Sequence, residues 1–224
     1  IFNFDIKRVK EIFEVGLPAA LEQVIFQIGI TAFLILVAFY GTEAYAAYGI
    51  GVQILSFSIV IGFGFSIAGA TLVGQHLGAK NEEQAKRAGW GAMRLSIISM
   101  TFFGVLITIF AEPLARYMID NDEVVRLTVI FIWLLGSMQP LMAIEFSLGG
   151  ALRGAGDTKT PLAITLTCLL FIRVFLAMIF FLLDARVEVI FSTLVADYVV
   201  KGFLYVARFR SDRWMNVLKT READ

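Results

Sequence analysis

The sequence predicts an all-α integral membrane protein with six transmembrane helices, and three observations support that fold class. Of its 224 residues, 58% are hydrophobic and only 17% are charged, whereas soluble domains carry about 25% charged residues. Apolar runs of about 20 residues recur, which is the length that an α-helix needs to cross roughly 30 Å of hydrocarbon. Basic residues gather in alternate connections between these runs, which is typical of membrane topology.

Six apolar runs of membrane-spanning length follow one another, separated by short polar connections. The predicted spans cover residues 12–39, 44–73, 88–110, 124–151, 161–183 and 189–207, and residues 208–224 form a polar tail. Consecutive helices with short connections are expected to run antiparallel. Residues 1–224 are therefore predicted to form a single six-helix transmembrane unit.

Two prolines and a group of glycines lie inside the predicted spans. Pro18 and Pro140 are expected to kink their helices or to leave a carbonyl unpaired. Glycines are concentrated in the second span, at Gly49, Gly51, Gly62, Gly64 and Gly69. Small residues let helix backbones approach closely in lipid, and bending of the helix is a second interpretation of the same glycines.

The charges of the connections predict an orientation for the chain. With the amino terminus inside, 13 of the 19 basic residues fall in cytoplasmic segments: Lys7, Arg8, Lys10, Lys80, Lys86, Arg87, Arg153, Lys159, Arg208, Arg210, Arg213, Lys219 and Arg221. The outside connections hold Arg116, Arg126 and Arg186. Because basic loops stay on the cytoplasmic side, both termini are expected in the cytoplasm, with the chain in the cell inner (cytoplasmic) membrane.

Several function classes are disfavoured by composition alone. The net charge is +0, so nothing favours a nucleic-acid partner bound through bulk charge. The one Cys, Cys168, and the one His, His76, rule out a disulfide framework and argue against a metal site built from thiols or imidazoles. An intramembrane enzyme needs a nucleophile and a base or paired catalytic acids. Since no acidic pair has a suitable spacing on one helix, no enzyme activity is expected.

Charged residues at bilayer depth are costly and point to function by default. The predicted spans contain Glu22, Arg94, Glu145, Arg173, Asp197 and Lys201. Arg94 lies close enough to the inner interface for its side chain to extend into the headgroups, so we set it aside. From a rise of about 1.5 Å per residue, the remaining depths pair Arg173 with Asp197, and Lys201 with either Glu145 or Asp197.

These pairs have two interpretations. They could be a salt-bridge cluster that only holds the last three helices together, or a cluster that breaks and re-forms as the protein works. Glu22 has no predicted cation nearby, so its carboxyl is expected to hold a proton or a sodium ion. Gln23, Gln27 and Gln53 could supply further oxygens to such an ion. A hydrogen-bonded acid without an ion is the alternative for Glu22.

The connection between the fourth and fifth spans has the features of a tight helical hairpin. Gly154 and Gly156 can adopt the left-handed conformation that ends a helix. Asp157, Thr158 and Thr160 can cap the start of the next helix, and Pro161 fits a first helical position because it needs no N–H partner. This hairpin is expected at the cytoplasmic surface.

The hairpin, with its sequence LRGAGDTKTP, resembles the inter-helix signature of the multidrug and toxic compound extrusion (MATE) transporters. Three further stretches resemble the family in the same order: GLP at 16–18 with Glu22 and Gln23, VGQ with LGA at 73–79, and RFRSDRW at 208–214. The family motif in the loop consists of Arg153, Gly154, Gly156, Asp157, Thr158 and Pro161. Together these matches cover nearly the whole chain.

The resemblance implies a twelve-helix transporter built from two six-helix lobes, of which this chain matches the C-terminal lobe. The chain starts at Ile1 without a Met, so it is expected to be a piece of a longer protein that lacks its N-terminal lobe. The implied activity is multidrug efflux by antiport of amphiphilic or cationic organic molecules against H⁺ or Na⁺, through alternating access. No cofactor is implied besides the coupling ion.

The resemblance also implies site residues. Intramembrane acids on the first and fourth helices of this lobe carry the coupling ion in some members, which points to Glu22 and Glu145, and we add Asp197 from its predicted pairing. In sodium-coupled members the acids would fall at Phe26 and near Met142, so H⁺ and Na⁺ both stay open. A cavity for amphiphilic substrates needs apolar walls with few polar anchors, for which the candidates are Gln23, Phe26, Gln27, Gln53, Gln139 and Met142.

Two alternatives to drug efflux stay open. A lipid-linked oligosaccharide flippase of the same superfamily would have a more basic cavity, whereas only Arg173 and Lys201 are expected there. A structural membrane subunit without transport activity would have little use for acids and prolines inside its spans.

Overall fold

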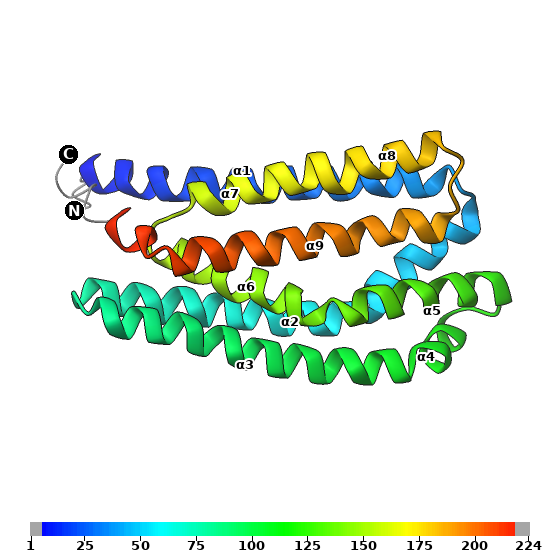
Figure 1. Ribbon diagram of the computed structural model, residues 1–224, viewed down its shortest axis with the longest axis horizontal. Helices are drawn as coiled ribbons and strands as arrows, with labels where there is room; N and C mark the ends of the chain where they lie inside the picture. Colours follow the sequence, from blue (N-terminus) through cyan, green and yellow to red (C-terminus); the bar gives the residue numbers. More distant parts are fainter. Residues whose placement is uncertain (1–5, 218–224) are drawn as a thin grey trace, which may run out of the picture.

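The computed structural model describes residues 6–217, and the side chains from residue 12 onward. Its helices lie along one long axis (Figure 1). In chain order they are α1 (Ile6–Ala38), α2 (Thr42–Gly78), α3 (Glu82–Ile109), α4 (Ala111–Met118), α5 (Asp122–Ser137), α6 (Gln139–Gly154), α7 (Lys159–Thr167), the π-helical η1 (Cys168–Val174), α8 (Phe175–Leu182), α9 (Val187–Arg210) and the short 3₁₀ turn η2 (Arg213–Met215). The basic residues Lys219 and Arg221, and the side chains of Lys7, Arg8 and Lys10, lie outside the described part.

The described residues contain helices long and apolar enough to cross a membrane. Five stretches qualify by themselves within residues 6–217, and α5 with α6 adds a sixth when the two are taken as one bent span. The all-α, six-span fold class predicted from the sequence is therefore confirmed.

The fourth span is bent where the sequence places a proline. The axes of α5 and α6 differ by 54° at a break of at most four residues, and Pro140 lies in the first turn of α6. Proline has no N–H and fits a helix start without losing a hydrogen bond, so the chain ends one helix at Ser137 and begins another at Gln139. The predicted kink at Pro140 is confirmed, whereas α1 continues through Pro18 as one helix.

The fifth span contains an irregularity that the sequence did not predict. Between α7 and α8, residues Cys168–Val174 form a π-helix, in which the turn is wider than in an α-helix. Short π-helical segments are rare and often occur at functional sites. Arg173 lies inside this segment, so the local widening sets the direction of a charged side chain.

Helices α2 and α6 pack backbone against backbone at their glycines. A Cβ atom added at Gly150 would collide with the carbonyl oxygen of Ser66, and one added at Gly154 would collide with that of Ala70. Gly69 of α2 also lies close to α6, although less so, since a Cβ there would be 3.0 Å from the carbonyl oxygen of Ser147. These three glycines support the close-packing interpretation of small residues in spans.

The other glycines of α2 divide into two groups. Gly51 and Gly62 are buried under the rings of Phe131 and Phe146, whereas a Cβ at Gly49 or Gly64 would have open space around it. Close packing therefore accounts for Gly51, Gly62 and Gly69 but gives no reason for Gly49 and Gly64.

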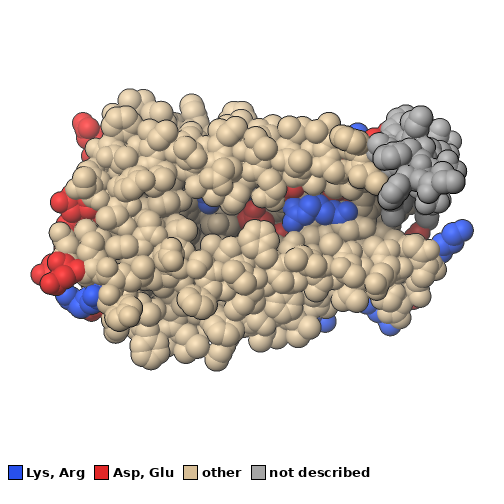
Figure 2. All heavy atoms as spheres, turned by 180° about the vertical axis from the view of Figure 1, so that it is seen from behind, with Lys and Arg blue, Asp and Glu red and all other residues tan. Residues whose placement is uncertain are grey.

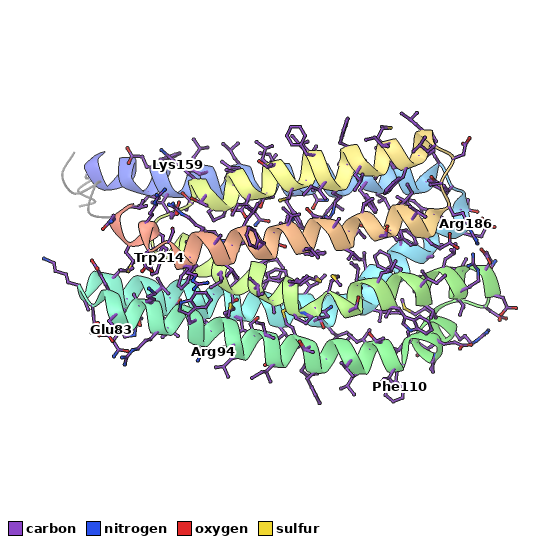
Figure 3. All side chains as sticks on the ribbon, viewed as in Figure 1. Glu83, Arg94, Phe110, Lys159, Arg186 and Trp214 are labelled. Carbon is purple, nitrogen blue, oxygen red and sulfur yellow. The ribbon has the colours of Figure 1, made fainter. Side chains whose placement is uncertain are left out.

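Helix α1 begins and α9 ends at the same end of the bundle (Figure 1). The described basic residues near that end, in the connections or the adjoining turns, are Lys80, Lys86, Arg87, Arg153, Lys159, Arg208, Arg210 and Arg213. Figure 3 labels Lys159 and Glu83 at this end and Arg186 at the other. Arg94 is exposed on α3.

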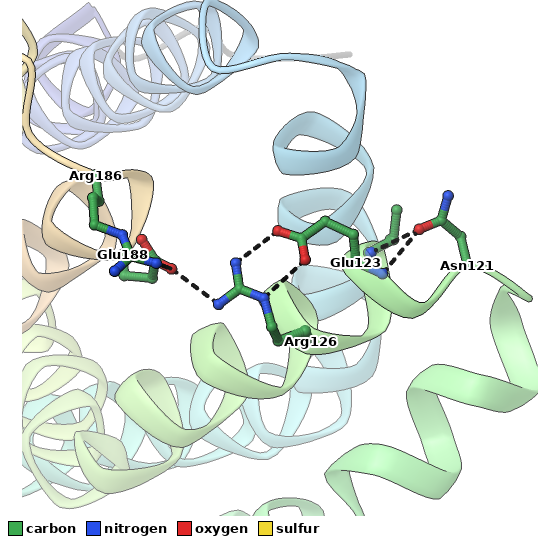
Figure 4. Close-up of polar contacts among 6 residues, drawn as sticks. Asn121, Glu123, Arg126, Arg186 and Glu188 are labelled. Carbon is green, nitrogen blue, oxygen red and sulfur yellow. Dashed lines mark hydrogen bonds and ion pairs between the residues drawn. The ribbon is translucent and has the colours of Figure 1, made fainter.

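The opposite end carries a network of acidic and basic side chains (Figure 4). Asn121 caps α5 by accepting hydrogen bonds from the backbone N–H groups of Glu123 and Val124. Arg126 forms ion pairs with Glu123 at 2.6 Å and with Glu188 of α9 at 3.1 Å. This network connects α5 with α9 at the end where the predicted outside arginines lie.

Replacing Gly150 by Ala is expected to destabilise the bundle, because the new methyl group meets the rigid backbone of α2 at Ser66. Overpacking of this kind costs about 1–3 kcal/mol. The measurement is the thermal unfolding temperature in detergent, compared with Gly64→Ala, whose methyl group meets no atom within 4 Å. Equal unfolding temperatures for the two variants would contradict the tight α2–α6 contact.

Candidate functional site

A cavity of about 230 Å³ lies inside the bundle. Its walls come from α1, α2, α5, α6, α7, η1 and α9, and most of the side chains that line it are apolar or aromatic. The aromatic members are Phe26, Tyr48, Phe63, Phe131, Phe146, Tyr198 and Tyr205. Figure 2 shows a recess midway along the molecule in which acidic and basic side chains are visible, while the surface around it is uncharged.

Four charged side chains line the cavity: Glu22, Glu145, Arg153 and Arg173. Two are acidic and two are basic, so their formal charges cancel. In a low-dielectric interior an unpaired charge is far more costly than a paired one, and each of these four has an ion-pair partner of opposite sign.

Glu22 has a cation partner, contrary to the expectation from the sequence. Arg153 Nη1 donates to both carboxylate oxygens of Glu22, at 3.0 and 3.1 Å, and Thr165 donates to Oε1 at 3.3 Å. The prediction that Glu22 lacks a nearby cation was wrong because α1 projects beyond the α6–α7 connection (Figure 1). Glu22 thus lies within reach of the last turn of α6, where Arg153 stands.

The second charged group spans α6, η1 and α9, and we call Glu145, Arg173, Asp197 and Lys201 the α9 cluster. Arg173 contacts Asp197 at 3.2 Å, and Lys201 contacts Asp197 at 3.2 Å and Glu145 at 3.3 Å. The pairs predicted from helix depth are all present. Asp197 and Lys201 are fully buried, whereas the Glu145 side chain is 17% exposed.

Aromatic rings surround the cations of the α9 cluster. Lys201 Nζ lies 5.8 Å from the ring centre of Phe26 and 5.6 Å from that of Tyr198, and the Arg173 guanidinium lies 5.6 Å from the same tyrosine ring. Contacts of this length between a cation and a ring face are favourable, and more so where water is excluded. The rings partly replace the water that the two cations lose on burial.

The predicted cavity residues fall into two groups. Gln23, Phe26 and Met142 line the cavity. Gln27 and Gln53 are exposed and are not part of its lining, so the structure does not bring them to Glu22. Gln139 is fully buried with its side chain against Gly104 of α3, and neither amide atom has a hydrogen-bond partner among the described residues. Its assignment to the cavity wall is corrected.

The sequence did not identify Arg153 and Thr165 as partners of Glu22. Arg153 was visible as a loop residue of the family motif. A rise of about 1.5 Å per residue places it on the same helix as Glu145, about 12 Å further along the axis. That position was the one indication in the sequence that Arg153 could reach a buried acid. Thr165 carried no such signal, since a hydroxyl in an apolar run is common.

The hairpin motif binds the end of α9. Arg208 donates to one Asp157 oxygen through Nε at 2.8 Å and through Nη2 at 2.6 Å, and the Thr160 hydroxyl donates to both oxygens. Asp157 also accepts from the Thr160 backbone N–H at 3.3 Å, which is the predicted cap. Gly156 has φ +79°, as its predicted left-handed role requires.

The roles predicted for three other residues of the hairpin are corrected. Thr160 lies inside α7 and donates its hydroxyl to Asp157 instead of capping the helix. Gly154 is the last residue of α6 and has no positive φ; it allows close approach to Ala70 instead. Thr158 makes no capping hydrogen bond, and its hydroxyl is buried without a partner among the described residues. Pro161 lies in the first turn of α7, where a proline costs no hydrogen bond.

Trp214 closes the same end of the bundle. It is fully buried, stacks on Phe209 with ring centres 4.6 Å apart, and donates its indole N–H to the Phe209 carbonyl at 2.8 Å. Figure 3 places it between the end of α9 and α3. The segment after α9 is thereby attached to the helices beside the hairpin.

A bundle of membrane-length helices around an apolar cavity with buried, opposed charges is the architecture of a multi-pass membrane carrier. Comparison with known proteins agrees with this class. The family model described as MatE matches residues 18–179. The chain belongs to the MatE family, the MATE transporters.

Individual relatives support the same family. The chain is 32% identical over 214 residues to "Probable multidrug resistance protein NorM" of Thermotoga maritima, covering 92% of this chain and 44% of that protein. It is 30% identical over 152 residues to "Multidrug resistance protein NorM" of Aliivibrio fischeri, with 67% and 33% covered. The chain spans less than half the length of these curated relatives.

Solved structures share the fold. The MATE transporter ClbM in complex with Rb⁺ matches with a TM-score of 0.86 at 21% identity, over 95% of this chain and 50% of that one. An outward-facing multidrug resistance MATE family transporter matches with a TM-score of 0.77 at 22% identity, over 88% and 44%. The described helices therefore have the arrangement found in half of a MATE structure.

The Glu22–Arg153 pair is expected to show energetic coupling. A double-mutant cycle with Glu22→Gln, Arg153→Gln and the double variant should give an interaction energy of about 1–3 kcal/mol, because the two groups are in direct contact and the Glu22 side chain is buried. The measurement is chemical unfolding in mixed micelles. Additive effects of the two substitutions would show that the contact contributes nothing.

Removing Arg208 is expected to loosen the hairpin, because Asp157 loses two charge-assisted hydrogen bonds. Such bonds are worth about 1.5–3 kcal/mol, so Arg208→Ala should speed amide hydrogen exchange in residues 154–160 by about tenfold or more. Mass spectrometry of peptides from this segment measures the change. Arg210→Ala serves as control, since Arg210 is exposed, and an equal change there would contradict a specific link.

Proposed function

We propose that this chain is one six-helix lobe of a cation-coupled exporter of amphiphilic organic molecules, which works by alternating access. The observation that carries the proposal is the cavity: its wall is mostly apolar and aromatic, and its few charges are mid-helix acids held by bases. Apolar walls with few convergent polar groups suit amphiphilic ligands. The names of the relatives, which refer to multidrug resistance, support the same substrate class.

The matched lengths support a second lobe. The chain covers 44% of the Thermotoga maritima relative and 50% of the ClbM structure. We infer that a second, N-terminal six-helix lobe faces this one and that substrates bind between the two. We assign the face that carries the recess in Figure 2 to contact with that lobe, because the charged side chains visible there are otherwise surrounded by uncharged surface.

The proposed orientation places both ends of the chain in the cytoplasm. The basic residues of the connections lie near the end where α1 begins and α9 ends, whereas Arg116, Arg126 and Arg186 lie at the other end. Because positive charge stays on the cytoplasmic side, the first end faces the cytoplasm of the cell that holds this protein in its inner membrane.

Coupling is assigned to Glu22, Glu145 and Asp197. Each carboxylate is in contact with a base, so a proton or a sodium ion that reaches one of these acids weakens its ion pair. Breaking a pair at this depth frees a base and alters the contacts of α1, α6 and α9 together. That exchange of partners gives the lobe two arrangements, which alternating access requires.

The alternative function, a flippase that binds lipid-linked oligosaccharides in a basic cavity, has less support. The cavity lining contains two acids and two bases, and the bases are engaged by carboxylates. A cavity of that composition has no excess positive charge for a diphosphate group.

Asp197→Asn distinguishes a coupling cluster from a merely structural one. If the α9 cluster takes part in coupling, the whole protein with Asp197→Asn is produced at normal yield. Its efflux of a fluorescent amphiphilic cation from proteoliposomes with an imposed cation gradient then falls by about tenfold or more. Asp184→Asn, in the exposed α8–α9 connection, should change neither. Loss of yield with normal specific efflux would assign the α9 cluster to stability alone. Absence of efflux from the unmodified protein would overturn the proposed function itself.

A further inference from the structure

The ammonium group of Lys201 occupies an unusual position in the α9 cluster. It lies between two carboxylates, 3.2 Å from Asp197 Oδ2 and 3.3 Å from Glu145 Oε1. The lysine is fully buried, and Nζ makes no hydrogen bond of normal geometry within the described part of the chain. Charge attraction rather than directed hydrogen bonding therefore holds this cation in place.

The partner Asp197 has the same property. It is fully buried, and neither of its carboxylate oxygens has a hydrogen-bond partner in the described residues. Its Oδ2 faces two cations at 3.2 Å, Lys201 Nζ and Arg173 Nη2, and carboxylate oxygens are the ligands that a hard metal cation prefers. An ion of one positive charge placed at Nζ would meet the same oxygens that Lys201 meets.

The charge balance of the α9 cluster depends on Lys201. Glu145 and Asp197 contribute two negative charges, and Arg173 and Lys201 contribute two positive charges. Without the ammonium the cluster carries an excess of one negative charge, which a buried site does not tolerate unpaired. A single monovalent cation would restore neutrality.

The route to this position comes from the cavity. Glu145 lines the cavity and is 17% exposed, whereas Lys201 lies behind it and is fully buried. An ion entering through the cavity reaches the Glu145 carboxylate first and finds the place between the two acids already filled. Among the described residues, no group of three or more His, Cys, Asp or Glu side chains could hold a metal ion by itself.

We propose that the Lys201 ammonium is a resident cation, which fills the position between Glu145 and Asp197 where a sodium ion would otherwise bind. Lys201 is thereby a residue that determines ion specificity: it closes the carboxylate site of this lobe to Na⁺ and leaves proton exchange as the means by which these acids change charge. This inference rests on the proposed function only for its meaning in transport, because the occupancy of the position is independent of efflux.

The test measures sodium binding by the whole purified protein in detergent. Lys201→Met keeps an apolar side chain of similar length and removes the charge, so it should bind one more equivalent of ²²Na⁺ than the unmodified protein. Its unfolding temperature should also rise with about 100 mM NaCl, as expected for a ligand that binds only the folded state. N-methylglucamine chloride at the same ionic strength should give no such rise.

Two matched variants complete the design. Lys201→Arg retains a cation and should bind no additional Na⁺. The double variant Glu145→Gln with Lys201→Met removes one acid together with the base, so the cluster is neutral again and should also bind none. Counting the additional equivalent, rather than total Na⁺, separates this site from any other sodium site in the protein.

Each outcome is decisive. Lys201→Met that folds only when Na⁺ is present supports the proposal, since the ion then replaces the ammonium. The proposal is overturned if Lys201→Met folds and binds no additional Na⁺, or if it fails to fold in either salt. The unmodified protein could show no efflux while Lys201→Met still binds the additional Na⁺. That result would contradict the proposed function and leave this inference intact.

Discussion

The pairing of charges inside an apolar bundle is the constraint on which this structure depends. Asp197 and Lys201 stand one turn apart on α9, are both fully buried and pair with each other at 3.2 Å, and each also contacts a partner from another helix. Arg173 of η1 and Glu145 of α6 supply those partners. Three segments far apart in the chain therefore meet at one place in which every charge is paired, and leaving one of these charges without its partner would cost several kcal/mol.

Two departures from regular α-helix make this meeting possible. The 54° bend between α5 and α6 changes the direction of the span that carries Glu145 and Arg153. The π-helical turn at Cys168–Val174 changes the direction of the side chain of Arg173. Straight helices would present these residues at different angles, so the irregular turns belong to the site as much as the charged groups do.

Much of this arrangement was accessible from the sequence. The spans follow from apolar length, and the charge pairs of the α9 cluster follow from the fixed rise of a helix, which converts residue numbers into depths. The bend was accessible because Pro140 marks it. The MATE resemblance rested on motifs in four separate stretches, and the family match includes residues 18–179.

Other features left no readable signal. The π-helical segment has neither proline nor glycine in its sequence CLLFIRV, so no residue marks the wider turn. Arg153 meets Glu22 only because α1 projects past the hairpin. The offset of one helix along another cannot be predicted from the sequence of either helix alone. Gln139 was placed in the cavity because it is polar, whereas packing against Gly104 of α3 turned its side chain away. These are properties of how helices are set against one another.

The glycine contact between α2 and α6 has a mechanical consequence. Gly150 and Gly154 of α6 lie directly against the backbone carbonyls of Ser66 and Ala70 of α2. Neither helix can slide along the other unless the two first move apart. A displacement of α6 along its axis would therefore have to carry α2 with it. The Glu22–Arg153 contact joins α1 to this interlocked pair, so a change in that contact acts on α2 and α6 together.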